Sequence, residues 1–205
     1  TPSEDLGSRP AGVPFDVTVN AGAAYQLTSS LGDISGTRVT ANKPVGVLAG
    51  NRCGQVPVGT SFCDTVLEML PPVSTWGAAT PVVSLSSRVG GDTFKVIASE
   101  ADTLVSVEGP MPSSSTLASG EVLELVLDGN HWITADKPIM VLQFAHGGNF
   151  EQRPGDPFSM ILPPASQYQS SYVFTTPSTG FASHFVNVVA PSSVAATGGV
   201  QIDGS

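Results

Sequence analysis

The sequence predicts an all-β, antiparallel fold made of two tandem copies of a β-sandwich-like module of about 94 residues. Three observations support this prediction. Two long stretches are near duplicates of each other, the apolar residues alternate with a period of two, and turn-forming residues are abundant, with 22 Gly and 17 Pro among 205 residues. Proline and glycine interrupt helices, so a chain with this composition favours short strands joined by turns.

The duplication sets the size of the repeating unit. The sequence VTANKPVGVL at 39–48 returns as ITADKPIMVL at 133–142, and DTVLEMLPP at 64–72 is echoed by DPFSMILPP at 156–164. A repeat of this length is a structural unit, so we expect a first module at 1–109 and a second at 110–205, joined through 109–116. Half-repeats of roughly 45 residues are faintly visible, which leaves open a propeller-like ring with two blades per copy.

Strands are predicted where apolar residues alternate or run together. Residues 15–19 and 103–108 alternate, which suits a half-buried strand, whereas 140–144 is almost continuously apolar and should form a central strand covered on both faces. Val47 and Val141, each after a Lys-Pro pair, should therefore be core positions. The other expected strands lie at 39–42, 66–70, 94–99, 121–127, 131–134 and 158–162, with a tight turn at 128–130.

Charge excludes two classes of partner. The chain carries a formal net charge of −9 with eight basic residues, too few for the dense basic face that nucleic-acid binding needs. The same acidity disfavours docking on an anionic membrane. No apolar run approaches the roughly 18 residues that span a bilayer, so membrane insertion is not expected either.

Two cysteines, Cys53 and Cys63, are predicted to form a disulfide. The repeat places Gly147 and Gly155 opposite them, so both cysteines are missing together from the second copy, as expected of one crosslink. Two buried free thiols are the alternative. A disulfide closing the Gly/Pro-rich loop 54–62 would indicate an oxidising compartment, and hence an extracellular or cell-surface protein.

The pattern Asn42-Lys43-Pro44-Val45, Cys53, Cys63 and the run PPVSTWG at 71–77 resembles the IgGFc-binding domain family. The resemblance is dense over 21–77 and weaker to about residue 190. It implies an extracellular, β-rich binding or adhesion module. The family brings no catalytic motif that could be assigned to residues of this chain, and antibody binding by one member does not follow from the fold.

No catalytic or metal-binding constellation is recognisable. The sequence has no Gly-x-Ser-x-Gly elbow, and His131, His146 and His184 stand in unrelated contexts. An Asp-x-Asp-x-Asp-Gly calcium loop is also missing, although calcium bound by loop carbonyls stays open. We therefore expect a protein that is not an enzyme, with no catalytic residues, no cofactor and no metal site.

The candidate binding surface is the pair of loops at 50–63 and 145–157, which differ most between the matched copies. We expect a non-enzymatic extracellular adhesion or recognition module whose partner is a protein or glycan on a surface or in mucus. The alternatives are a structural spacer that builds a fibre or stalk, and a secreted hydrolase-associated domain. The two arginines of these loops, Arg52 and Arg153, could instead pair with the nearby acids Asp64 and Asp156. The candidate residues are Asn51, Arg52, Gln55, His146, Asn149 and Arg153.

Overall fold

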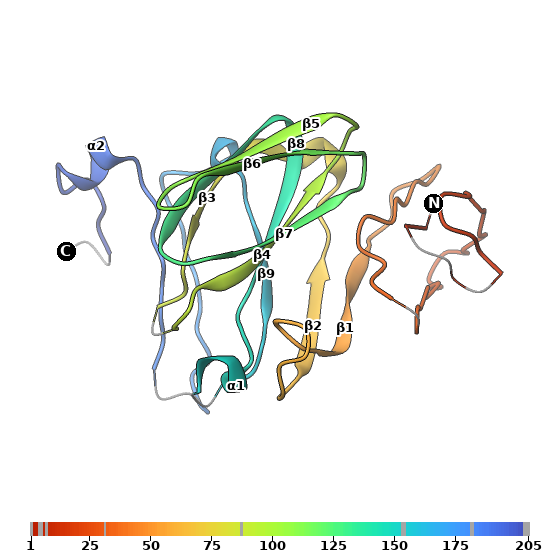
Figure 1. Ribbon diagram of the computed structural model, residues 1–205, viewed down its shortest axis with the longest axis horizontal. Helices are drawn as coiled ribbons and strands as arrows, with labels where there is room; N and C mark the ends of the chain where they lie inside the picture. The colour runs from red at the N-terminus through yellow and green to blue at the C-terminus, as the bar shows by residue number, and fades with distance from the viewer. Residues whose placement is uncertain are drawn as a thin grey trace.

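The computed structural model confirms an all-β, antiparallel protein (Figure 1). It describes residues 2, 3, 6, 8–30, 32–86, 88–152, 155–180 and 183–202. Two sheets are formed. One is the hairpin of β1 (Leu48–Gly54) and β2 (Asp64–Met69), and the other has seven strands.

The seven strands follow one another along the chain between residues 77 and 162. They are β3 (Gly77–Val83), β4 (Asp92–Ala98), β5 (Thr103–Glu108), β6 (Ser113–Leu117), β7 (Val122–Leu127), β8 (Asn130–Phe144) and β9 (Ser159–Leu162). The helical pieces are single turns: η1 (Val73–Thr75), α1 (Gly148–Glu151), η2 (Ala165–Gln167) and α2 (Ser192–Ala195).

Strand β8 organises the large sheet because it is long enough to serve two sets of neighbours. Its first part pairs with β3 on one edge and β5 on the other, and its last part pairs with β4 and β9. The sheet therefore curls (Figure 1). Side chains from both parts of β8 belong to one core. The prediction that 140–144 is a central strand is confirmed, since Val141 is buried between β4 and β9.

The core consists of branched and aromatic residues at alternate strand positions, which the pleat of a strand directs to one face. Phe94 and Val96 of β4 meet Val105 and Val107 of β5 in this core. Its other buried members are Val82, Ala98, Leu117, Leu127, Ile133, Ile139 and Val141.

Two expected strands are not formed. Residues 15–19 and 39–42 have no strand pairing in the structure, and their valines Val17 and Val39 are exposed. The alternation there is genuine, but a strand also needs a neighbour to hydrogen-bond. Val47 is correspondingly only half-buried, in contrast to Val141.

Strands on both sides of residue 109 contribute to the large sheet. Residues 109–112 lie in the turn between β5 and β6, which pair as a hairpin with Val107 opposite Ser113. The division of the chain into 1–109 and 110–205 stays a prediction. The turns η1 and η2 each follow one of the two Pro-Pro pairs, so this part of the repeat has the same local structure in both copies.

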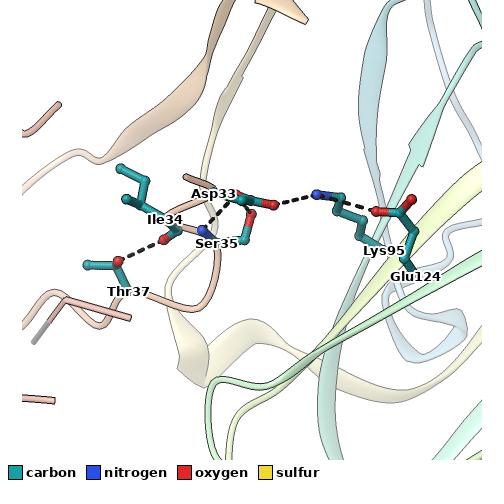
Figure 2. A network of polar contacts seen from close by, with 6 residues as sticks. All are labelled: Asp33, Ile34, Ser35, Thr37, Lys95 and Glu124. Atoms are coloured by element: carbon teal, nitrogen blue, oxygen red, sulfur yellow. Dashed lines mark hydrogen bonds and ion pairs between the residues drawn. The ribbon is translucent and has the colours of Figure 1, made fainter. Parts of the chain in front are cut away.

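The N-terminal segment contacts the large sheet through a charged cluster, shown in Figure 2. The Lys95 ammonium on β4 lies 2.6 Å from an oxygen of Asp33 and 3.6 Å from one of Glu124. The other Asp33 oxygen accepts hydrogen bonds from the Ser35 amide and hydroxyl, at 2.9 and 2.6 Å. Burial acts to raise the pKa of Asp33, but the hydrogen bonds from Lys95 and Ser35 outweigh it and hold that pKa below its ordinary value.

This cluster should make stability depend on pH in acid. Because the folded pKa of Asp33 is depressed, its contribution is complete above the ordinary value of about 3.9 and is lost as pH falls through the lower folded pKa. Asp33→Asn should therefore lower the free energy of unfolding near pH 6, by less than about 1 kcal/mol because the carboxylate is half-exposed. The gap to the parent protein should close below about pH 4. Urea unfolding near pH 6 and below about pH 4 measures this difference in stability. Asp16→Asn, which changes an exposed carboxylate, is the control. A gap that widened in acid would contradict the assignment.

Candidate recognition surface

The first predicted loop is the tip of the β1–β2 hairpin. Leu48 pairs with Met69 and Asn51 with Val66, and the register then shifts so that Gly54 lies opposite Asp64. Cys53 and Cys63 form a disulfide across this shift, with a Cα–Cα distance of 4.9 Å, so the predicted pairing is confirmed. A crosslink between residues 10 apart stabilises by roughly 2–3 kcal/mol, mainly by restricting the unfolded chain.

The tip of this loop presents apolar groups to solvent. Val56 is buried and anchors the loop, whereas Val58 and Phe62 are exposed, at 90% and 64% of their full surface. Phe62 has a φ of 67°, in the left-handed region that bulky side chains rarely adopt. Such a conformation costs about 1–3 kcal/mol and persists only where the surroundings enforce it, here beside the disulfide. The loop thus holds an aromatic ring on the surface.

The second predicted loop connects β8 to β9 and is anchored from inside. His146 is fully buried, with Nε2 lying 2.9 Å from the Thr93 hydroxyl and its ring packed edge-on against Phe150 at 4.3 Å. Arg88 donates to the carbonyl oxygens of His146 and Asp156, both at 3.3 Å. One cation therefore ties both ends of the loop to the segment before β4.

The structure brings the two loops together. The Gly147 amide donates to the Val56 carbonyl at 2.7 Å. A Cβ at Gly147 would lie 3.0 Å from the Phe62 carbonyl oxygen and 3.1 Å from that of Ser61, so glycine allows this close approach. Both loops lie at the lower end of the molecule in Figure 1, near α1 and the β1–β2 turn. We call the exposed residues of 50–63 and 145–157 the loop surface.

The candidate residues differ in where they lie. Asn51, Arg52, Gln55 and Asn149 are exposed on the loop surface, whereas His146 points inward. Arg153 lies outside the described residues. The alternative that Arg52 pairs with Asp64 is not seen, because its guanidinium forms no ion pair with any described residue and the Asp64 carboxylate accepts from the Thr65 amide instead.

Two residues that matter for this surface were not predicted. Arg88 holds the second loop, as described above, and Asp92 is fully buried at the start of β4. One Asp92 oxygen accepts from the Leu85 amide at 2.7 Å and from the Gln143 side chain at 2.9 Å. Their partners are 7 to 68 residues away along the chain, so no local motif signals either role.

A family model described as IgGFc binding protein matches residues 1–205. The chain belongs to this family. The IgGFc-binding protein of Homo sapiens is 34% identical over 166 residues, which is 80% of this chain but 3% of that protein. No solved structure matches.

The residues that carried the family resemblance have structural roles. Cys53 and Cys63 close the hairpin loop, and Pro71 accepts a hydrogen bond at 3.2 Å from the Trp76 indole, which packs beside Met140 and Leu142. The family pattern thus specifies the hairpin and its attachment to the large sheet.

The described residues offer no group of three or more His, Cys, Asp or Glu side chains that could hold a metal ion. Within the same part of the chain, no helix is long and apolar enough to cross a membrane. The described residues of the loop surface present exposed aromatic rings at Phe62 and Phe150, the Arg52 cation, the Asp156 carboxylate and several amides.

Proposed function

We propose that this chain is a non-enzymatic recognition module of an extracellular or cell-surface protein, and that it binds a protein partner through the loop surface. The observation that carries the proposal is the packing of the two unequal loops against each other, joined by the bond from Gly147 to Val56. Loops that differ between copies of a repeat are free to carry function, because the shared scaffold keeps them in place.

The residue types on this surface suit protein recognition. Arg52 is exposed and forms no ion pair with any described residue, and Val58 and Phe62 are exposed in the same loop. Arginine and aromatic residues are enriched where interfaces concentrate their binding energy. The disulfide and the anchored His146 order both loops before a partner arrives, which reduces the entropy lost on binding.

Two observations support the extracellular setting. A disulfide between Cys53 and Cys63 persists in oxidising compartments and is rare in the cytosol. The family model and the human relative are both named for binding the Fc region of IgG. The Fc fragment is accordingly the first protein probe, with a purified mucin as the glycan-bearing alternative.

The test is a binding measurement with each probe immobilised. We expect the parent chain to bind one of them, and Arg52→Ala to weaken that binding at least about tenfold, since a directed arginine contact is worth about 1.4 kcal/mol or more. Lys43→Ala is the matched control, because it removes an exposed cation away from the loop surface. It should leave the affinity unchanged.

Two results would contradict the proposal. One is binding that Arg52→Ala leaves intact while Lys43→Ala weakens it, which would place the contact elsewhere. The other is a folded chain that binds neither Fc nor mucin, which would favour the spacer alternative. Thermal unfolding of both variants shows whether a loss of binding reflects a loss of fold.

A further inference from the structure

The β1–β2 hairpin reproduces one edge of the large sheet in detail. Leu48 pairs with Met69 as Leu142 pairs with Ile161, and Gly50 pairs with Leu67 as Phe144 pairs with Ser159. These are the equivalent positions of the sequence repeat, 94 apart on one strand and 92 apart on the other. The hairpin is therefore the counterpart of the last part of β8 with β9, in the same register.

The counterparts differ in burial. Ile133, Ile139 and Leu142 are 0%, 2% and 9% exposed in the large sheet. Their equivalents Val39, Val45 and Leu48 are 57%, 59% and 58% exposed. The same apolar pattern thus lies in a core in one copy and on the surface in the other. Strand β8 has β3, β4, β5 and β9 as paired neighbours, whereas β1 pairs with β2 alone among the described strands.

The strands that would cover the hairpin have sequence counterparts after β9. Residues 169–175 correspond to β3, and residues 183–190 correspond to β4 and the one residue that follows it. Phe185 and Val188 stand where β4 has Phe94 and Ile97. Phe94 is fully buried, but Phe185 is 59% exposed, so this segment also carries a core pattern without a core.

One contact joins equivalent positions of the two copies, as a two-fold relation between them would. Thr75 and Gln167 are equivalent residues, and the Gln167 side-chain amide donates to the Thr75 carbonyl. Nearby, Gly77 packs so closely on Pro164 that a Cβ would lie 2.4 Å from its ring. Contact between equivalent positions is what a two-fold axis produces.

We propose that residues 183–190 pair with β1 of the same chain as β4 pairs with β8, and that 169–175 takes the place of β3. The register then places Val188 opposite Gly46 and Phe185 opposite Ala49, since Ile97 lies opposite Met140 and Phe94 opposite Gln143. This arrangement completes a second module from the two ends of the chain. It buries the exposed apolar residues of both and fixes the hairpin that carries Arg52.

In the structure, residues 183–190 instead run along β3, on the side of the large sheet away from β1 (Figure 1). The Asn187 side chain contacts the Ser84 carbonyl there, at 3.4 Å. The proposed pairing is thus a second arrangement of this segment. We expect β1 to pair with this segment of its own chain rather than with another molecule, because a covalently tethered strand has an effective concentration near millimolar.

Paired cysteines test the register. The double variant Gly46→Cys with Val188→Cys, oxidised in a glutathione buffer, should form a crosslink within one chain in most molecules, because opposite residues of an antiparallel pair lie about 4.5–5.5 Å apart at Cα. Phe185→Cys with Ala49→Cys should behave likewise. Ala49→Cys with Val188→Cys is the matched control, about 10 Å out of register, and should crosslink at least tenfold less. Peptide mapping separates these links from Cys53–Cys63.

Each other result overturns the proposal. A crosslink found only between chains, at twice the mass of one chain, would assign the pairing to a second copy. Equal yields in the control would show an unpaired, freely moving segment, and no crosslink would show that the strands do not meet. As a measurement free of engineered thiols, Phe185→Asp should remove hydrogen-exchange protection from the amides at 45–49 while those of β4 stay protected. Unchanged protection at 45–49 would also overturn it.

Discussion

Phe94→Ala should lower the free energy of unfolding by about 3–5 kcal/mol. The ring is fully buried in the core cluster that also holds Val105 and Val107, so its removal leaves a cavity inside that core. The loss combines the transfer energy of a buried aromatic ring with the cost of a cavity that the curled sheet cannot collapse. Denaturant unfolding measures it as a shift of the midpoint at an unchanged slope.

Phe62→Ala provides the matched control, because that ring is 64% exposed on the loop surface. It should change stability by less than about 0.5 kcal/mol. Equal effects of the two substitutions would show that the core enclosed by β8 does not hold the fold together. A changed slope for Phe94→Ala would instead indicate a less compact native state.

The sequence predicted part of the large sheet: residues 103–108, 121–127 and 140–144 were expected to be strands and lie in β5, β7 and β8, whereas β3 and β6 were not expected. Alternate apolar positions, as in 103–108, report one buried face. Residues 15–19 alternate equally well and form no strand. Alternation is a local property, whereas pairing requires a neighbour that only the tertiary structure supplies.

The repeat predicted the size of the unit more directly than its limits. An offset of 92–94 residues is the same wherever the cut between copies is placed, so the sequence could not choose between a boundary at 109 and one elsewhere. In the structure, β5 and β6 form a hairpin across residue 109, and the strands of one sheet run from Gly77 to Leu162. Hydrogen-bond partners show where a unit closes, and these are not encoded locally.

The candidate site was predicted in outline. The unequal loops were identified from the repeat, and the structure brings them into contact through Gly147 and Val56. His146 was a candidate because it lies in the loop that corresponds to the disulfide loop of the first copy, yet it is buried against Thr93 and Phe150. The sequence feature that indicates its burial is the apolar run before it, whose residues lie in the core up to residue 145.

Asp92→Ala should lower the free energy of unfolding by about 2–4 kcal/mol. The carboxylate is fully buried, and one oxygen accepts from the Leu85 amide and the Gln143 side chain. Alanine would leave the Leu85 amide without its acceptor in a place that water does not easily reach, and buried unpaired groups cost more than the bonds they replace. Gln143 would keep its bond to the Val83 carbonyl at 2.9 Å.

Asp92→Asn separates the two possible causes of that loss. The amide keeps an oxygen of the same size in the same place, so it should retain both bonds and lose less than half of what Ala loses. If Asn proved as damaging as Ala, the charge rather than the acceptor would be responsible. The effect should also reach the loop surface, because Asp92 fixes the segment that leads into Arg88, and Arg88 holds the carbonyls of His146 and Asp156. In Asp92→Ala, the amides at 145–152 should therefore exchange faster than the amides that exchange only through global unfolding, since the loop loses the anchor that orders it for a partner.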